Sequence, residues 1–157
     1  KLPLVLFLEN NLYGMGSSVK YVHARGGDFQ ASGVPYGINT TVVDGMDVLS
    51  VQEAASAAVN SARRGDGPAF IEAKTFRFHG HSMADPLNYR TGEEERIWRK
   101  RDPLITFPQY LVELGLTTYD NIEDIRKQVK EQVSNAIKFA DESPFPELED
   151  LEKDVYA

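Results

Sequence analysis

Polar residues that could bind ions or move protons follow two strongly apolar segments of this chain. Asn10 and Asn11 come directly after the apolar run of residues 2–8, and their amide oxygens suit a hard cation such as Mg²⁺. His79 and His81 follow a second apolar run further along the chain. Histidine is the usual proton-transfer side chain near neutral pH. The residue types therefore indicate an oxygen-ligated cation at the first cluster and acid–base chemistry at the second.

Each cluster also has a simpler interpretation. A pair of asparagines can merely open a turn after a strand. Of the two histidines, one could cap the strand while the other is solvated, and their spacing from Asp85 does not match a particular metal site. From these residues alone, the structural and the functional interpretations both stay open.

The first apolar run predicts a strand. Residues 2–8 are almost continuously apolar but too few to cross a bilayer, which is typical of a strand buried on both faces. Residues 14–33 are polar and glycine-bearing, and they predict a long surface loop. A buried strand needs neighbours on both sides, so we expect Lys1 to lie within a larger domain.

A strand–helix–strand unit follows this loop. Residues 39–43 are β-branched and strand-like, and residues 69–76 predict a second strand. Residues 51–64 between them predict an alanine-rich helix, with Ser50 as N-cap and Glu53 completing a capping box. Such a unit is typical of a parallel sheet. Ligands bind beyond the carboxyl ends of parallel strands, so the asparagine and histidine clusters should meet at one edge.

The rest of the chain is predicted to be helical. Residues 93–101 form a charged helical segment, Pro103 suits the first position of another helix, and Pro108 implies a kink or boundary there. Residues 121–141 have apolar positions at helical spacing and predict the longest helix.

Composition limits the class of protein. The 157 residues have a formal net charge of −7, which argues against a nucleic-acid-binding surface, and no apolar stretch is long enough for a membrane span. The chain has no cysteine, so disulfides and thiolate chemistry are excluded.

Several motifs together carry a resemblance to one family. They are LPLVLFLENNLYGMG at 2–16, VDGMD at 43–47, GPAFIE at 67–72, TFRFHGHSMADP at 75–86 and RDP at 101–103. In this order they resemble the α subunit of the thiamine diphosphate-dependent 2-oxo acid dehydrogenase component, with the pyruvate dehydrogenases as nearest members. The resemblance covers essentially the whole chain and corresponds to the C-terminal portion of that subunit.

The resemblance implies a cofactor site. In the family the second asparagine binds Mg²⁺ through its side chain, and the tyrosine two residues later binds it through its carbonyl. These roles fall on Asn11 and Tyr13, and the Mg²⁺ would hold the diphosphate of thiamine diphosphate. His81 matches the histidine that lies beside the cofactor and helps the acyl group to reach the lipoyl partner. The Gly-Asp-Gly half of the family's motif would lie before Lys1.

The resemblance also implies roles in the loop around His81. Arg77 and Asp85 match positions that help to order this loop, and Ser82 matches the serine that is phosphorylated in mitochondrial members. Asn88 stands where a second regulatory serine often occurs. This difference favours a bacterial, cytoplasmic enzyme, with the mitochondrial matrix or a plastid as alternatives.

The resemblance implies a fold and a function. We expect a partial thiamine diphosphate-binding α/β domain at residues 1–90, and a helical extension at 91–157 that packs on it. The implied reaction is oxidative decarboxylation of pyruvate with acetyl transfer to a lipoyl domain, within an α₂β₂ heterotetramer that also meets a lipoyl-bearing acyltransferase component. By itself the chain should be inactive. Alternatives are the same reaction class on branched-chain 2-oxo acids or acetoin, or a non-catalytic α/β partner-binding module.

Overall fold

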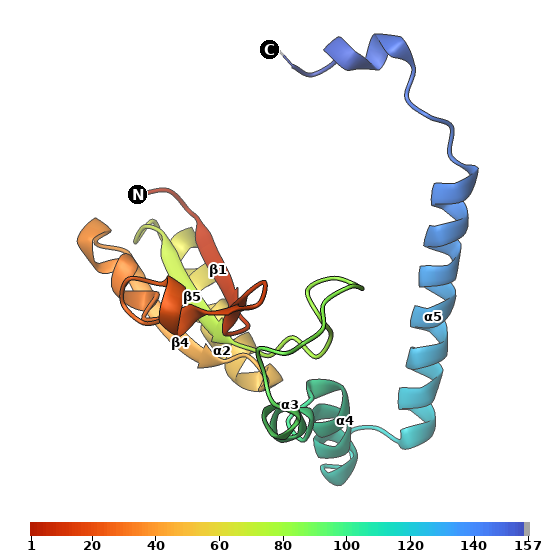
Figure 1. Ribbon diagram of the computed structural model, residues 1–157, viewed down its shortest axis with the longest axis horizontal. Helices are drawn as coiled ribbons and strands as arrows, with labels where there is room; N and C mark the ends of the chain where they lie inside the picture. Colours follow the sequence, from red (N-terminus) through yellow and green to blue (C-terminus); the bar gives the residue numbers. More distant parts are fainter. Residues whose placement is uncertain (156–157) are drawn as a thin grey trace. The chain divides into compact units, whose positions relative to one another are not determined.

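A three-stranded parallel sheet organises the first part of the chain. The structure, a computed structural model, describes residues 1–155 (Figure 1). Strand β5 (Ala69–Lys74) lies between β1 (Val5–Asn10) and β4 (Asn39–Asp44), and both neighbours are parallel to it. The predicted α/β class with a parallel sheet is confirmed.

Helix α2 (Val48–Arg63) provides the crossover between β4 and β5 and packs on one face of the sheet. Its alanines favour a helix and let it approach the sheet closely, so Ala58 and Ala62 are buried. Gly65, at φ +81°, adopts the left-handed conformation that follows the helix end. The hydrophobic core combines Ala58, Ala69 and Ile71 with the partly buried Val5, Val43, Ala54 and Ala55.

The N-terminus of α2 differs from the prediction. Asp47, and not Ser50, is the N-cap, and its carboxylate accepts hydrogen bonds from the backbone N–H groups of Leu49 at 3.0 Å and Ser50 at 3.2 Å. The predicted capping box is therefore wrong. Aspartate is as good an N-cap as serine, and its position starts the helix nearly one turn earlier.

Strand β1 is not buried on both faces as predicted. Among residues 1–155 it pairs only with β5, so it is an edge strand there, and Leu6 and Phe7 are 40% and 44% exposed. The central strand is β5, in which Ile71, Glu72 and Ala73 are each 1% exposed. The apolar pattern correctly predicts a strand, but the number of strand neighbours decides its burial.

The region predicted as a long loop contains short elements. Strands β2 (Tyr13–Gly14) and β3 (Ser17–Ser18) form a hairpin, followed by helix α1 (Val19–Val22) and the 3₁₀ turns η1 (Gln30–Ser32) and η2 (Val34–Tyr36). The prediction of an irregular loop is therefore wrong for the residues of β2, β3, α1 and η1, whereas η2 lies just beyond the predicted loop. Polar composition does not distinguish a loop from such short elements.

Two helices follow the loop that contains the histidines. Helix α3 (Gly92–Arg99) begins after the N-cap Thr91, whose hydroxyl accepts from the N–H of Glu94. Helix α4 (Pro103–Glu113) begins at a proline as predicted and continues through Pro108.

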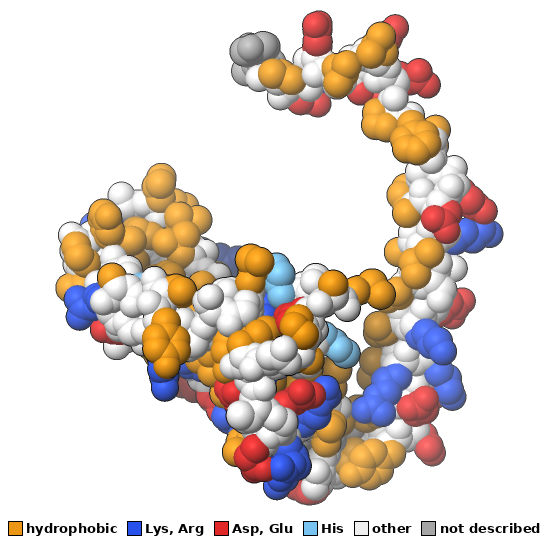
Figure 2. All heavy atoms as spheres, in the orientation of Figure 1, with side chains coloured by type: hydrophobic (Ala, Val, Ile, Leu, Met, Phe, Trp, Pro, Cys, Tyr) orange, Lys and Arg blue, Asp and Glu red, His pale blue; other side chains and the backbone are white. Residues whose placement is uncertain are grey.

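The described residues form two compact units, Lys1–Tyr110 and the residues from Leu111 onward. The second unit contains helix α5 (Tyr119–Glu142) and the 3₁₀ turn η3 (Leu148–Glu152). Figure 2 shows charged and hydrophobic side chains interspersed along α5. The division into domains at 1–90 and 91–157 stays a prediction, and residues 156–157 of that range lie outside the described residues.

Among residues 1–155, no helix combines the length and apolarity needed to cross a membrane.

Candidate functional site

The carboxyl ends of the three strands meet at one edge of the sheet. Asn10 of β1 and Asp44 of β4 both pair with Lys74 at the end of β5. The next residues continue this arrangement, because the N–H of Thr75 donates to the carbonyl of Asn10 at 2.9 Å. The segments after β1 and β5 therefore leave the sheet side by side, as the strand order of a parallel sheet predicts.

Residues 10–13, at the end of β1 and just after it, form two consecutive turns that are called the double turn below. The Oδ1 atom of Asn10 accepts from the N–H of Leu12 at 3.0 Å, and Oδ1 of Asn11 accepts from the N–H of Tyr13 at 3.0 Å. Leu12 adopts φ +71°, a conformation that non-glycine residues rarely take. The two side-chain hydrogen bonds hold this backbone in place.

A buried carboxylate supports the double turn. Glu72 is 1% exposed, and its Oε1 accepts from Nδ2 of Asn10 at 2.6 Å and from Nζ of Lys74 at 2.8 Å. This residue was not predicted as part of the site. An ionisable side chain between the apolar residues Ile71 and Ala73 of a strand was the available signal.

Tyr13 is linked to helix α3. Its hydroxyl donates to the two carboxylate oxygens of Glu94, at 3.1 Å and 3.0 Å. Partial burial raises the pKa of the Tyr13 hydroxyl above its ordinary value, and the hydrogen bond to Glu94 and the charge of that carboxylate add to the increase. The ring of Tyr13 also packs against that of Tyr89, with 5.3 Å between ring centroids. Glu94 lies 81 residues away in the chain, so no local pattern predicted this contact.

The loop after β5 is held by Asp85. Its Oδ2 accepts from the Tyr89 hydroxyl at 2.6 Å and from the N–H of His81 at 2.7 Å, and its Oδ1 accepts from the N–H of Leu87 at 3.0 Å. These donors favour the charged carboxylate, with the Tyr89 hydroxyl contributing most, and they lower the pKa of Asp85 to about 2. Tyr89, like Glu72, was not predicted as part of the site.

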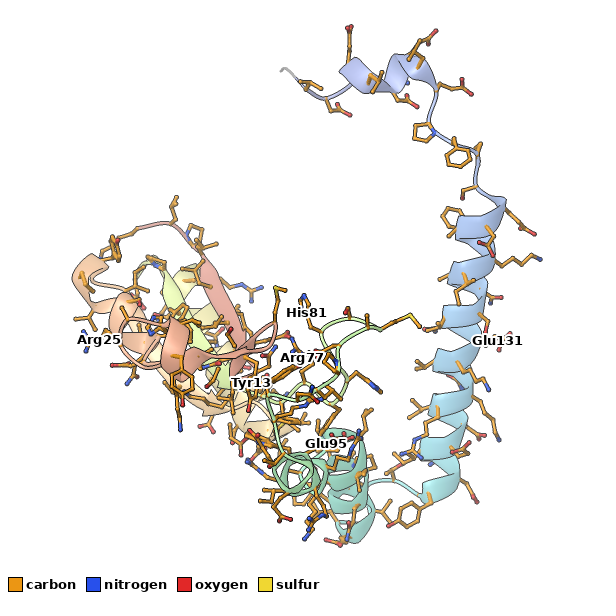
Figure 3. The ribbon with its side chains drawn as sticks, in the orientation of Figure 1. Tyr13, Arg25, Arg77, His81, Glu95 and Glu131 are labelled. Atoms are coloured by element: carbon orange, nitrogen blue, oxygen red, sulfur yellow. The ribbon has the colours of Figure 1, made fainter. Side chains whose placement is uncertain are left out.

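Arg77 connects this loop to the β2–β3 hairpin. Its Nη2 donates to the carbonyl of Met15 at 2.8 Å and to the Tyr89 hydroxyl at 3.0 Å. Its Nη1 lies 3.4 Å from Nδ1 of His81. Because a guanidinium only donates, Nδ1 can join this contact only as an acceptor, which places the imidazole proton on Nε2. Figure 3 shows Tyr13, Arg77 and His81 gathered in one region of the first unit.

Arg90 fixes the backbone that leads into this loop. Its guanidinium donates to the carbonyls of Arg77 and, at 2.9 Å, of Phe78, and lies 4.9 Å from the centre of the Phe76 ring. Trp98 of α3 stacks on Phe76, with 5.4 Å between centroids and 7° between planes. Helix α3 and the start of the His81 loop are thus held together by aromatic and cation–π contacts.

The remaining predicted residues lie apart from this network. The side chains of His79 and Ser82 are exposed, and the carbonyl of Ser82 accepts from the N–H of Asp85 at 3.2 Å. Within residues 1–155, no cluster of three or more histidines or acidic residues has a metal-binding arrangement. The structure therefore gives no support to a histidine-ligated metal.

The donors at the double turn have the chemistry that Mg²⁺ requires. The Asn11 amide and the Tyr13 carbonyl are both hard oxygen ligands, and the hydrogen bond between Asn11 Oδ1 and the Tyr13 N–H holds them in one turn. Mg²⁺ demands octahedral coordination, so these two donors fit as part of a ligand set.

Comparison with known proteins identifies the class. The chain matches the model of the dehydrogenase E1 component family over residues 1–149, and it belongs to that family. It is 41% identical over 159 residues to the testis-specific, mitochondrial pyruvate dehydrogenase E1 component subunit alpha of Homo sapiens. The identity is 39% over 160 residues to the chloroplastic pyruvate dehydrogenase E1 component subunit alpha-3 of Oryza sativa subsp. japonica. With the pyruvate dehydrogenase E1 component subunit alpha of Rhizobium meliloti (strain 1021) it is 38% over 156 residues.

The chain spans less than half the length of these relatives. The whole chain aligns with 40% of the human subunit and with 37% of the rice subunit. In the bacterial comparison, 99% of the chain aligns with 44% of the subunit. The resemblance to this family is confirmed. The activity, substrates and partners of the whole protein are proposals.

Proposed function

We propose that the protein containing this chain catalyses the oxidative decarboxylation of pyruvate on thiamine diphosphate and transfers the acetyl group to a lipoyl domain. Family membership and the names of the relatives support the reaction class. The observation that carries the proposal is the connection between two segments at one sheet edge. Arg77 reaches both the hairpin that begins at Tyr13 and the side chain of His81.

In this proposal, Asn11 and Tyr13 bind Mg²⁺. The amide oxygen of Asn11 and the carbonyl oxygen of Tyr13 would serve as two of its ligands, and so would help to hold the diphosphate of the cofactor. Thiamine diphosphate, when bound, supplies the carbanion-stabilising chemistry that a 2-oxo acid needs to lose carbon dioxide. The residues of this chain bind and orient it.

His81 is the proposed catalytic residue and would also contact the cofactor. With Nδ1 directed at Arg77, the exposed ring carries its proton on Nε2, where it can be donated to a reacting group. Arg77 and Asp85 are proposed to order the loop. Asp85 accepts the backbone N–H of His81, and Arg77 approaches its ring.

Ser82 is a proposed phosphorylation site. It is exposed and follows His81 directly. A phosphate would add close to two negative charges near the carboxylate of Asp85, and like-charge repulsion would disturb the loop. Substitution Ser82→Glu should therefore lower activity, while Ser82→Ala should not.

The proposed assembly is an α₂β₂ heterotetramer that meets a lipoyl-bearing acyltransferase component. Since this chain offers only part of a ligand set for Mg²⁺, it should bind thiamine diphosphate weakly and have no activity by itself. We propose the bacterial cytoplasm as its location on the basis of Asn88. The relatives include mitochondrial and chloroplastic proteins.

Activity of the complete enzyme tests the proposal. The full-length subunit is co-expressed with the β subunit and assayed for acylation of a lipoyl domain with pyruvate, a branched-chain 2-oxo acid and acetoin, and for carbon dioxide release with the two 2-oxo acids. Pyruvate should be the preferred substrate, and His81→Ala should reduce lipoyl acetylation far more than the matched control His79→Ala. Preference for another substrate would reassign the enzyme within its class. Absence of lipoyl acylation with all three would favour a non-catalytic module.

A further inference from the structure

Glu72 is a buried carboxylate that the proposed mechanism does not use. It lies in the middle of β5 on the sheet face opposite to Ile71, because strand residues alternate between faces. A buried charge is costly unless it is paired and hydrogen-bonded. Both conditions hold here, since one oxygen of Glu72 meets the Lys74 ammonium at 2.8 Å and the Asn10 amide at 2.6 Å.

The contact with Glu72 determines how the Asn10 amide is oriented. A carboxylate only accepts hydrogen bonds, so the NH₂ end of the amide must face Glu72. The oxygen end then faces the N–H of Leu12, from which it accepts at 3.0 Å. A flipped amide would place two acceptors against each other and a donor against the N–H of Leu12. Glu72 thereby selects one of two orientations.

The orientation of the Asn10 amide constrains the backbone of the double turn. Leu12 is in the left-handed region, at φ +71°, and such a conformation persists only when its surroundings enforce it. The hydrogen bond from the Leu12 N–H to Asn10 is one such constraint. Asn11 and Tyr13 flank Leu12, so the same constraint places their oxygens.

We infer that Glu72 is a positioning residue that sets the affinity for the metal–diphosphate group through Asn10, without touching that group. The inference rests on the proposed function and deepens it. Glu72 fixes the amide of Asn10, Asn10 fixes the backbone of Leu12, and the double turn then presents the oxygens of Asn11 and Tyr13.

A pair of substitutions isolates this chain of contacts. Asn10→Asp retains an acceptor for the Leu12 N–H, but it places the new carboxylate against the carboxylate of Glu72 in a buried position. Adding Glu72→Gln restores a donor–acceptor pair with reversed polarity, because the new amide donates to the new carboxylate. Glu72→Gln alone keeps an acceptor for Asn10 but loses the charge. Glu9→Gln changes an exposed glutamate of β1 and is the matched control.

The test is calorimetric titration of the full-length subunit, assembled with its β subunit, with thiamine diphosphate and Mg²⁺. Asn10→Asp should raise the Kd about 10- to 100-fold, as do changes to residues that orient metal ligands. Glu72→Gln should raise it less, the double variant should recover most of the affinity, and Glu9→Gln should change nothing. At saturating cofactor, kcat should change much less than the Kd.

Other outcomes distinguish a failure of the inference about Glu72 from a failure of the proposed function. If Asn10→Asp and Glu72→Gln lower the melting temperature but leave the Kd unchanged, Glu72 is only structural and the inference is wrong. The same holds if the double variant binds no better than Asn10→Asp. If Asn10→Asp fails to fold, an unchanged Kd in Glu72→Gln is sufficient to overturn the inference. If the unaltered protein binds no thiamine diphosphate, the proposed function itself fails.

Discussion

The hydroxyl of Tyr89 donates to the carboxylate of Asp85 at 2.6 Å and accepts from the guanidinium of Arg77 at 3.0 Å. The tyrosine thus joins the two residues expected to order the His81 loop. A carboxylate and a guanidinium that share one hydroxyl form a connected polar network. Its disruption should affect the loop before it affects the sheet.

Tyr89→Phe should loosen the His81 loop. The variant keeps the ring contact with Tyr13 but loses both hydrogen bonds, which should cost about 1 kcal/mol of stability. Hydrogen–deuterium exchange of the peptide 79–88 should become faster, while exchange in β5 should not change. Tyr36→Phe removes an exposed hydroxyl and is the control. Unchanged exchange in the Tyr89 variant would contradict the role assigned to this network.

Asp85 should make stability depend on pH in the acidic range. Its pKa in the folded protein is about 2, below the ordinary value of 3.8, so the folded state binds the proton less tightly than the unfolded state. The stabilisation is therefore fully present above pH 3.8 and is lost as the pH falls through about 2. Thermal unfolding of Asp85→Asn and the unaltered protein should differ above this window and converge below it. A difference that stays constant across the window would contradict the shifted pKa.

Asp47→Ala should destabilise helix α2 by about 1 kcal/mol, because it removes the acceptor for two backbone N–H groups. Ser50→Ala is the informative comparison. The Ser50 hydroxyl only donates to the Asp47 carboxylate, at 3.0 Å, and its loss should cost less. Urea unfolding of both variants measures the difference. A larger loss in Ser50→Ala would restore the serine as the helix cap.

Ile71 should be the most sensitive core position of the sheet. It is 1% exposed and packs among the alanines of α2, so Ile71→Val should cost about 1 kcal/mol and Ile71→Ala about 2–5 kcal/mol. Ile97→Val, at a position that is 53% exposed, serves as the control and should be nearly neutral. Equal effects at the two positions would show that β5 is not central to the folded unit.

Local patterns in the sequence predicted much of the fold. Alternation of strand and helix signals predicted the β4–α2–β5 crossover, and Pro103 correctly predicted a helix start. The burial of β1 and the cap at Asp47 were mispredicted for different reasons. Burial depends on how many strands lie beside β1, and two good capping residues three positions apart cannot be ranked by residue type alone.

The site could be predicted only where its residues follow strand ends. Strand ends pointed to Asn11 and His81, whereas the roles of Tyr13, Arg77 and Asp85 came from the family resemblance, and all these roles stay predictions. Tyr89, Glu94 and Glu72 were missed because their contacts depend on the folded chain. Glu72 and Asn10 are 62 residues apart, and the register of β1 against β5 brings them together.

The most direct test of the account is the effect of Asn11→Ala on cofactor binding by the assembled full-length protein. If Asn11 ligates the Mg²⁺ that holds the diphosphate, the Kd of thiamine diphosphate at fixed Mg²⁺ should rise at least about tenfold, as for other residues that fix a metal site. Asn88→Ala, in the exposed part of the His81 loop, should leave the Kd unchanged. An Asn11→Ala protein that binds the cofactor as tightly as the unaltered one would contradict the central claim.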